Sequence, residues 1–136
     1  MRVVIETPKW SFIKMEEVGG RFVRAFLSPI PTPFNYGYIK GTMGWDGSPL
    51  DIIVLGDRLD MGCEIDVEVI GRVMFIDNGV EDDKYIASLD GGRHSLGIML
   101  FFWFYAFFKL FRNFLFQGRW SVNRYLGTVW FEEGVR

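Results

Sequence analysis

Short apolar runs separated by turn residues extend over the first two thirds of this 136-residue chain and limit the folds that are open to it. The runs lie at residues 3–6, 11–16, 21–27, 50–55, 64–69, 72–76 and 84–87, and each has the length of a strand. The pair Gly19-Gly20 separates the second and third runs and predicts a hairpin turn. Strands this short and this closely spaced are typical of a barrel. We therefore expect a mainly β fold with some α, built on a small antiparallel barrel.

Two of these runs also predict their place in the sheet. Residues 50–55 are apolar on both faces, which predicts a central strand. Residues 64–69 alternate strictly between acidic and aliphatic side chains, so one face should pack on the core and the other should lie in water. The three acidic residues of that run are therefore poor candidates for metal ligands: Glu64, Asp66 and Glu68.

The acidic residues are concentrated in one part of the chain. Residues 46–83 hold 11 of the 17 acidic groups but only two of the 15 basic ones, so the formal net charge of −2 hides a segregated distribution. Carboxylates that converge in a fold repel one another and need cations, and oxygen-rich sites suit hard ions such as Mg²⁺. A basic frame around such a centre would suit a phosphate compound.

Two pairs of aspartates in this region share one spacing. Asp46 and Asp51 flank a Gly-Ser-Pro turn, and Asp77 and Asp82 repeat the interval around Asn78-Gly79. Both pairs lie between apolar runs, where loop ends meet strand starts. Spacing alone leaves two interpretations open. The aspartates could converge on a cation site, or they could lie in acidic loops that face water, as carboxylates commonly do.

An ordered set of motifs runs from Val3 to about Ala87. The motifs are Phe34-Asn35-Tyr36-Gly37-Tyr38-Ile39, Asp46-Gly47-Ser48-Pro49-Leu50-Asp51, Gly62-Cys63, Ile70-Gly71, and Asp77 followed by Asp82-Asp83-Lys84. In this order they resemble the family I soluble inorganic pyrophosphatases. The second motif has the family signature Asp-x-Asp-Pro-x-Asp, with Ser48 in place of the middle aspartate. Arg119-Trp120 after Gly118 resembles the family again.

The resemblance implies an OB-like barrel with one main C-terminal helix, forming a single domain over residues 1–136. It implies hydrolysis of inorganic diphosphate to two phosphates with several Mg²⁺ ions, for which Mn²⁺ or Zn²⁺ could substitute. A homo-oligomer is implied as well.

The resemblance also assigns roles to residues that would otherwise pass as surface charges or partly buried aromatics. Metals that bind and ionise the attacking water would be held by Asp46, Asp51 and Asp82, and metals carried by the substrate by Asp77 and Glu6. The phosphates would be bound by Lys14, Arg24, Tyr36, Lys84 and Lys109. Glu16 would be a second active-site glutamate, and Ser48 stands where the family has the aspartate that accepts a proton from the water.

Two departures from the family reduce the expected activity. Ser48 has no pKa near neutrality and cannot act as a base, and Phe108 replaces the tyrosine that should precede Lys109. The tail from Ser121 to Arg136 is also too short for the family's long final helix. An inactive or weakly active relative that binds phosphate compounds or a partner is therefore the alternative.

The C-terminal third contains an apolar segment, residues 96–108, which carries no charge and is rich in Phe and Trp. Its 13 residues are fewer than a membrane span needs, and we expect Lys109 and Arg112 to end it. A helix packed on the barrel or on another subunit is the favoured interpretation, and a membrane-surface helix is a rival.

Three further expectations concern location and partners. The single cysteine, Cys63, excludes an internal disulfide, and residues 1–6 are too short for a signal peptide, so we expect a cytoplasmic protein. His94 has no second nitrogen or thiolate placed near it and is expected in a loop. The acidic patch would repel a nucleic-acid backbone, so no nucleic acid is expected as a partner.

Overall fold

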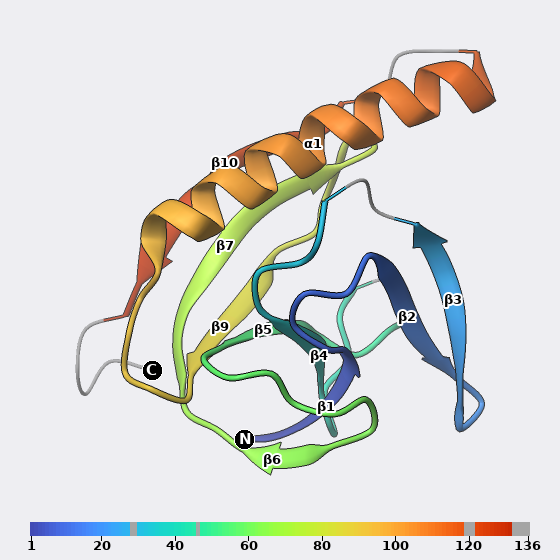
Figure 1. The fold of residues 1–136 in the computed structure, drawn as a ribbon. Helices are drawn as coiled ribbons and strands as arrows, with labels where there is room; N and C mark the ends of the chain where they lie inside the picture. Colours follow the sequence, from blue (N-terminus) through green and yellow to red (C-terminus); the bar gives the residue numbers. More distant parts are fainter. Residues whose placement is uncertain (28–29, 46, 119–121, 132–136) are drawn as a thin grey trace.

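The computed structural model describes residues 1–27, 30–45, 47–118 and 122–131. In this part of the chain one long helix lies along one side of a large sheet, and a two-stranded sheet stands at the other end of the molecule (Figure 1). The large sheet has the strand order β10-β7-β9-β5-β4-β1-β6, with β8 paired to β7, and the small sheet pairs β2 with β3.

The elements have the following bounds in chain order: β1 (Arg2–Thr7), β2 (Ile13–Val18), β3 (Arg21–Leu27), β4 (Asn35–Ile39), β5 (Asp51–Leu55), β6 (Glu64–Asp66), β7 (Val69–Asp77), β8 (Val80–Glu81), β9 (Lys84–Ser88), α1 (Ser95–Gln117) and β10 (Arg124–Trp130). The turn between β2 and β3 is formed by Gly19 and Gly20, both with positive φ, as predicted.

The prediction of a mainly β fold with one main C-terminal helix is confirmed, and the curved sheet is open between its edge strands β10 and β6. One pairing is not antiparallel: β5 and β9 run parallel, with Ile52 opposite Tyr85 and Leu55 opposite Ser88. A parallel pair needs a long connection, and β6, β7 and β8 lie between these two strands along the chain.

The sheet buries apolar side chains on both faces, and β5 divides the core. Ile53 and Leu55 point into the half that α1 covers, together with Phe34, Phe75 and Phe102. Ile52 and Val54 point to the other half, which contains Val3, Ile5 and Ile39. The prediction that β5 is central is confirmed, because all four of these β5 side chains are buried.

The alternating run at residues 64–69 is shorter as a strand than predicted. Only residues 64–66 belong to β6, and β7 starts at Val69. The predicted burial pattern is nevertheless present: Ile65, Val67 and Val69 pack on the second half of the core, while the three acidic residues that alternate with them are exposed. Glu64 and Asp66 form exposed ion pairs with Lys40 and Arg2.

The helix is longer than the sequence indicates. Lys109 and Arg112 end the uncharged run, but they do not end the helix, because α1 continues through both to Gln117. Gly118 then ends it in a left-handed conformation, with its N–H donating to the carbonyl of Phe114. By length and composition the window Leu96–Leu115 could cross a membrane, and 28% of it is buried in the protein.

The segment after the helix adds a strand that the sequence analysis did not predict. β10 pairs antiparallel with β7, with Arg124 opposite Ile76 and Trp130 opposite Gly71. It therefore extends the sheet beneath α1. The motif Arg119-Trp120 lies outside the described residues.

One buried amide connects four segments of the barrel. The Asn35 side chain is fully buried, and its oxygen accepts hydrogen bonds from the backbone N–H groups of Lys9 (3.0 Å) and Leu59 (2.9 Å). Its NH₂ group donates to the carbonyls of Asp57 (2.8 Å) and Val54 (3.3 Å). All the hydrogen-bonding capacity of the amide is used.

We expect Asn35→Ala to lower the free energy of unfolding by about 3 kcal/mol or more, because it leaves several backbone groups without their partner in a region that excludes water. Urea unfolding followed by circular dichroism measures this. Met43→Ala, at a side chain that is 76% exposed, is the control and should change stability by less than about 0.5 kcal/mol. Equal stability of the two variants would show that the amide network is not needed.

Candidate active site

A polar cleft with a volume of about 790 Å³ lies between the β2–β3 hairpin, the strands β4, β5 and β9, and the helix α1. Ten of the twelve residues that the sequence analysis assigned to a site line it, although they come from positions 6 to 109. They are Glu6, Lys14, Glu16, Tyr36, Ser48, Asp51, Asp77, Asp82, Lys84 and Lys109.

The centre of the cleft is an ion triad around Lys84. The Lys84 Nζ lies 2.8 Å from Asp51 Oδ2 and 2.7 Å from Asp82 Oδ2, and only 3% of the residue is exposed. The parallel pairing of β5 with β9 explains the contact between Lys84 and Asp51. Ile52 lies opposite Tyr85 in this pair, so Asp51 and Lys84, each one position earlier, start their strands at the same end of the sheet. Burial alone would lower the pKa of Lys84, but the charges of both aspartates and the hydrogen bonds to them raise it to about 12.

A second ion pair joins the helix to the sheet at the same cleft. Lys109 on α1 places its Nζ 2.7 Å from Asp77 Oδ2 at the end of β7, and both side chains are mostly buried. Arg112 also lines the cleft, one helical turn beyond Lys109. Residues three and four apart on a helix share a face, so this spacing could have indicated Arg112 from the sequence.

Tyr36 lies between two lysines. The Nζ of Lys14 is 4.8 Å from the centre of its ring, and the Nζ of Lys84 is 5.8 Å away. Burial, together with the charges of Asp51 and Asp82, raises the pKa of Tyr36 well above its ordinary value, so the hydroxyl keeps its proton. Burial and the positive charge of Lys84 lower the pKa of Lys14.

The β1 and β2 side of the cleft carries a glutamate that is neutral over much of the acidic range. Burial raises the pKa of Glu6 from 4.5 to about 7, although its Oε2 accepts a hydrogen bond from the N–H of Glu17 at 2.7 Å. The hydroxyl of Tyr38 donates to the carboxylate of Glu17. Glu17 and Tyr38 both line the cleft, and neither was assigned a role from the sequence. Tyr38 lies two residues after Tyr36 on one strand, a spacing that puts both on one face.

One predicted site residue does not line the cleft in the described structure. Arg24 is exposed on β3, where it pairs with Met15, and its neighbour Ala25 lines the cleft instead. The predicted metal ligand Asp46 lies outside the described residues. His94 lies in the loop just before α1, as expected, with its Nε2 3.4 Å from Asp90 Oδ2.

The donors of the cleft fit a hard divalent cation in kind. Asp51 and Asp82 already converge on a single positive charge, that of Lys84, and both present oxygen ligands. No three side chains of His, Cys, Asp or Glu within the described ranges come together in the arrangement of a metal site.

Residues 3–94 match the family model described as inorganic pyrophosphatase. This chain belongs to the inorganic pyrophosphatase family. The inorganic pyrophosphatase of Halalkalibacterium halodurans is 42% identical over 88 residues, which are 61% of this chain and 54% of that protein. The soluble inorganic pyrophosphatase of Oryza sativa subsp. japonica is 37% identical over 89 residues, 62% of this chain and 42% of that protein. The chain spans about half the length of the curated pyrophosphatases it matches.

Solved pyrophosphatase structures extend the likeness to the C-terminal third. The enzyme of Thermus thermophilus superposes with a TM-score of 0.77 at 23% identity, over 95% of this chain and 81% of that one. The pyrophosphatase of Helicobacter pylori gives 0.76 at 26% identity, over 98% and 85%. The pyrophosphatase fold therefore continues through α1 and β10, beyond the residues that the family model matches.

We expect stability to fall as pH rises from about 4.5 to about 7, because Glu6 loses its proton in the folded protein only at the upper end of this range. The folded state holds this proton more tightly than the unfolded chain, so stabilisation is fully present below the unfolded pKa and is lost as pH rises through the folded one. Glu6→Gln removes the cost of burying a charged carboxylate. At pH 8 in EDTA its free energy of unfolding should therefore exceed that of wild type by about 2–3 kcal/mol. Urea unfolding at pH 4.5 and pH 8 measures the difference.

The matched control for this prediction is Glu64→Gln. Glu64 is exposed, and hydrogen bonding to Lys40 lowers its pKa, so its replacement should weaken the protein at pH 8 and not strengthen it. A Glu6→Gln protein with the pH dependence of wild type would contradict the assignment of the shift to Glu6.

Proposed function

We propose that this protein hydrolyses inorganic diphosphate to two phosphates with Mg²⁺. The observation that carries the proposal is the alternation of carboxylates and lysines in one cleft, with Lys84 between Asp51 and Asp82 and Lys109 against Asp77. Such a site can hold cations and a polyanion next to one another. Phosphoryl transfer needs little covalent help from a protein, because positioning and charge neutralisation supply most of the acceleration.

The lysines and Tyr36 would bind the phosphates. Lys14, Lys84 and Lys109 bring positive charge to the cleft from three different elements, and the Tyr36 hydroxyl is held as a neutral donor. They would also neutralise the charge that develops on the leaving phosphate. We assign Arg24 to the same task, from β3 and beside Ala25 at the cleft.

The aspartates would hold the cations: Asp51 and Asp82 with Asp46, and Asp77 with Glu6 for those that arrive with the substrate. When bound, divalent cations would supply Lewis acidity that lowers the pKa of an attacking water. Lys84 holds Asp51 and Asp82 in place beforehand, so that their carboxylates converge. Mn²⁺ or Zn²⁺ would substitute for Mg²⁺.

Ser48 and Glu16 both line the cleft, and they determine how fast the reaction can be. Ser48 cannot accept the proton of an attacking water. Glu16 is exposed on β2 and is the first candidate for that role. A phosphate-binding protein without activity is the second candidate function, which Ser48 favours.

Wild-type protein should release phosphate from diphosphate only when Mg²⁺ is present, and millimolar Mg²⁺ should raise its melting temperature. A ligand at 100 times its Kd adds about 2.7 kcal/mol to the stability. Asp51→Asn should lose both the turnover and most of the thermal shift. Phosphate release and differential scanning fluorimetry measure the two effects. Thermal stabilisation without turnover would favour the binding protein, and an equal shift in both proteins would place the metal elsewhere.

Ser48→Asp should raise kcat at neutral pH by at least tenfold, because it restores a carboxylate that can take the proton of the attacking water. General-base assistance typically contributes about 10²–10⁴-fold. The wild type should gain activity toward alkaline pH, and the variant should show less of this gain. Ser48→Asn, which is similar in size to aspartate but has no base, is the control. An unchanged or lower kcat in Ser48→Asp would mean that another group already accepts the proton.

We also propose a cytoplasmic homo-oligomer in which one face of α1 lies at the interface. A continuous stripe of large apolar side chains faces outward along this helix, and Trp103 and Phe107 are 69% and 65% exposed. Soluble monomers rarely expose a patch of this kind. The other members of the stripe are Leu96, Leu100, Phe111 and Leu115.

Light scattering in detergent-free buffer should show an oligomer, and Trp103→Glu with Phe107→Glu should shift it toward the monomer. Val80→Glu, at an exposed apolar residue on β8, is the control and should leave the assembly unchanged. A wild-type monomer at micromolar concentration would refute the oligomer. Flotation of the wild type with liposomes would support a membrane-bound helix in its place.

A further inference from the structure

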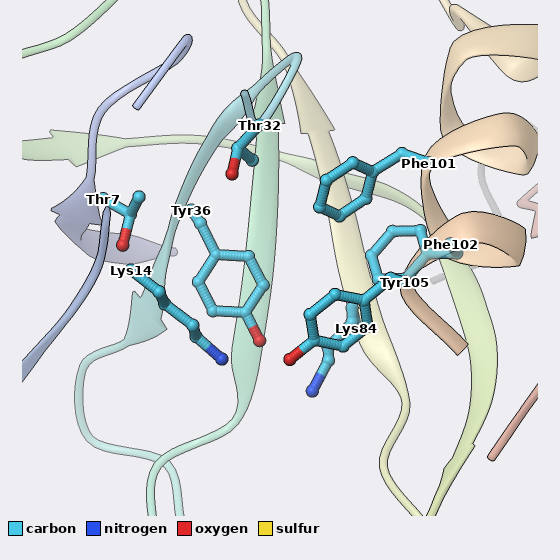
Figure 2. A pocket seen from close by; sticks show the side chains of 8 residues that line it. All are labelled: Thr7, Lys14, Thr32, Tyr36, Lys84, Phe101, Phe102 and Tyr105. Carbon is cyan, nitrogen blue, oxygen red and sulfur yellow. The ribbon is translucent and has the colours of Figure 1, made fainter. Parts of the chain in front are cut away.

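A small pocket lies at the inner end of the cleft. One of the polar side chains that line it, Tyr105, has not been given a role so far. Its volume is about 30 Å³, enough for one small group such as a water or a single phosphate oxygen. It shares Lys14, Tyr36 and Lys84 with the larger cleft and is closed on the helix side by Phe101, Phe102 and Tyr105. The polar ends of both lysines and both tyrosines gather at one edge of this space (Figure 2).

The Tyr36 hydroxyl indicates that something binds here. Tyr36 is only 8% exposed, and its buried hydroxyl oxygen has no hydrogen-bond partner of good geometry among the described residues, although the Asp51 carboxylate acts on it as an acceptor. Buried polar groups in native proteins are almost always hydrogen-bonded. A hydroxyl that keeps its proton and lacks a well-formed hydrogen bond to the protein is therefore well placed to donate to a ligand.

Tyr105 presents a second hydroxyl to the same place from the opposite wall. Figure 2 shows its hydroxyl pointing toward the Tyr36 hydroxyl across the pocket that both residues line. Lys109, one helical turn later, places its Nζ 5.5 Å from the centre of the Tyr105 ring. Burial raises the pKa of Tyr105, so its hydroxyl is also a neutral donor.

The charges around the hydroxyls of Tyr36 and Tyr105 favour a small anion. The ammonium groups of Lys14 and Lys84 approach the Tyr36 ring to 4.8 Å and 5.8 Å, and Lys109 lies beside Tyr105. Carboxylates also act on these tyrosines, but Asp51 and Asp82 are already paired with Lys84 and Asp77 with Lys109. Phe108, directly before Lys109, carries no polar atom, so Tyr105 supplies the hydroxyl of this part of α1.

We propose that the hydroxyls of Tyr36 and Tyr105 bind one and the same oxygen of a phosphate group at the inner end of the cleft, which makes Tyr105 a further substrate-binding residue. This rests on the proposed function for the identity of the phosphate compound. The two hydroxyls approach from β4 and from α1, so they fix the phosphate between the sheet and the helix.

Binding of inorganic phosphate and of imidodiphosphate, an unreactive diphosphate analogue, tests the proposal by calorimetry with Mg²⁺ present. Tyr105→Phe removes one oxygen atom and should weaken binding of the analogue by about tenfold or more, since a hydrogen bond to a charged group is lost. Tyr125→Phe is the matched control: its hydroxyl is bonded to Thr128 at 2.7 Å, and its ring packs on Phe102 away from the cleft. It should leave the affinity unchanged.

A double-mutant cycle decides whether the two hydroxyls share one oxygen. Groups that contact one atom are coupled, so the two substitutions should not be additive. The loss of affinity in the double variant Tyr36→Phe with Tyr105→Phe should differ from the sum of the losses in the two single variants. Additive losses would overturn the shared oxygen, and unchanged affinity in Tyr105→Phe would overturn the role of Tyr105. Melting temperatures of all variants separate a loss of binding from a loss of fold.

The same measurements separate this inference from the proposed function. A wild type that binds the analogue through Tyr105 but does not hydrolyse diphosphate would keep the inference and overturn the activity. A wild type that hydrolyses diphosphate, together with a Tyr105→Phe variant that binds the analogue normally, would keep the activity and overturn the inference. A wild type that binds neither phosphate nor the analogue would overturn both.

Discussion

The buried ammonium of Lys84 between two aspartates is the interaction on which the site depends. A buried lysine is costly unless it is paired, and here Asp51 and Asp82 both lie within hydrogen-bond distance. The arrangement exists because β5 and β9 pair in parallel and begin at the same end of the sheet. Two carboxylates are thereby held close together, which mutual repulsion would otherwise prevent.

The two-sided core explains why the cleft opens where it does. β5 has buried side chains on both faces, so the sheet cannot present a site through its middle, and polar groups are left to the ends of the strands and to the loops that join them. The helix α1 covers one half of the core with Phe101, Phe102 and Ala106 and extends Lys109 to Asp77. The packing of the helix and the geometry of the site are therefore linked.

The C-terminal third keeps the fold of the family with a different composition. The family model ends at residue 94, yet solved pyrophosphatases superpose over 95% and 98% of the chain. A helix can be preserved while its sequence changes, because packing on the sheet needs only apolar residues of suitable size on one face. The opposite face of α1 is free of that requirement, and here it is occupied by large apolar side chains.

The sequence by itself determined the mainly β architecture, the central place of β5, the alternation in residues 64–69 and most of the residues that line the cleft. These follow from local periodicity and from motifs whose order is read directly along the chain. It did not determine the parallel pairing of β5 with β9, the strand β10, the length of α1, or the ion pairs of Lys84 and Lys109. Pairing partners, the end of a helix and the protonation of Glu6 depend on groups far apart in sequence, on burial and on competing charges. Only the folded chain brings those together, and the meeting of Tyr105 on the helix with Tyr36 on the sheet is decided in the same way.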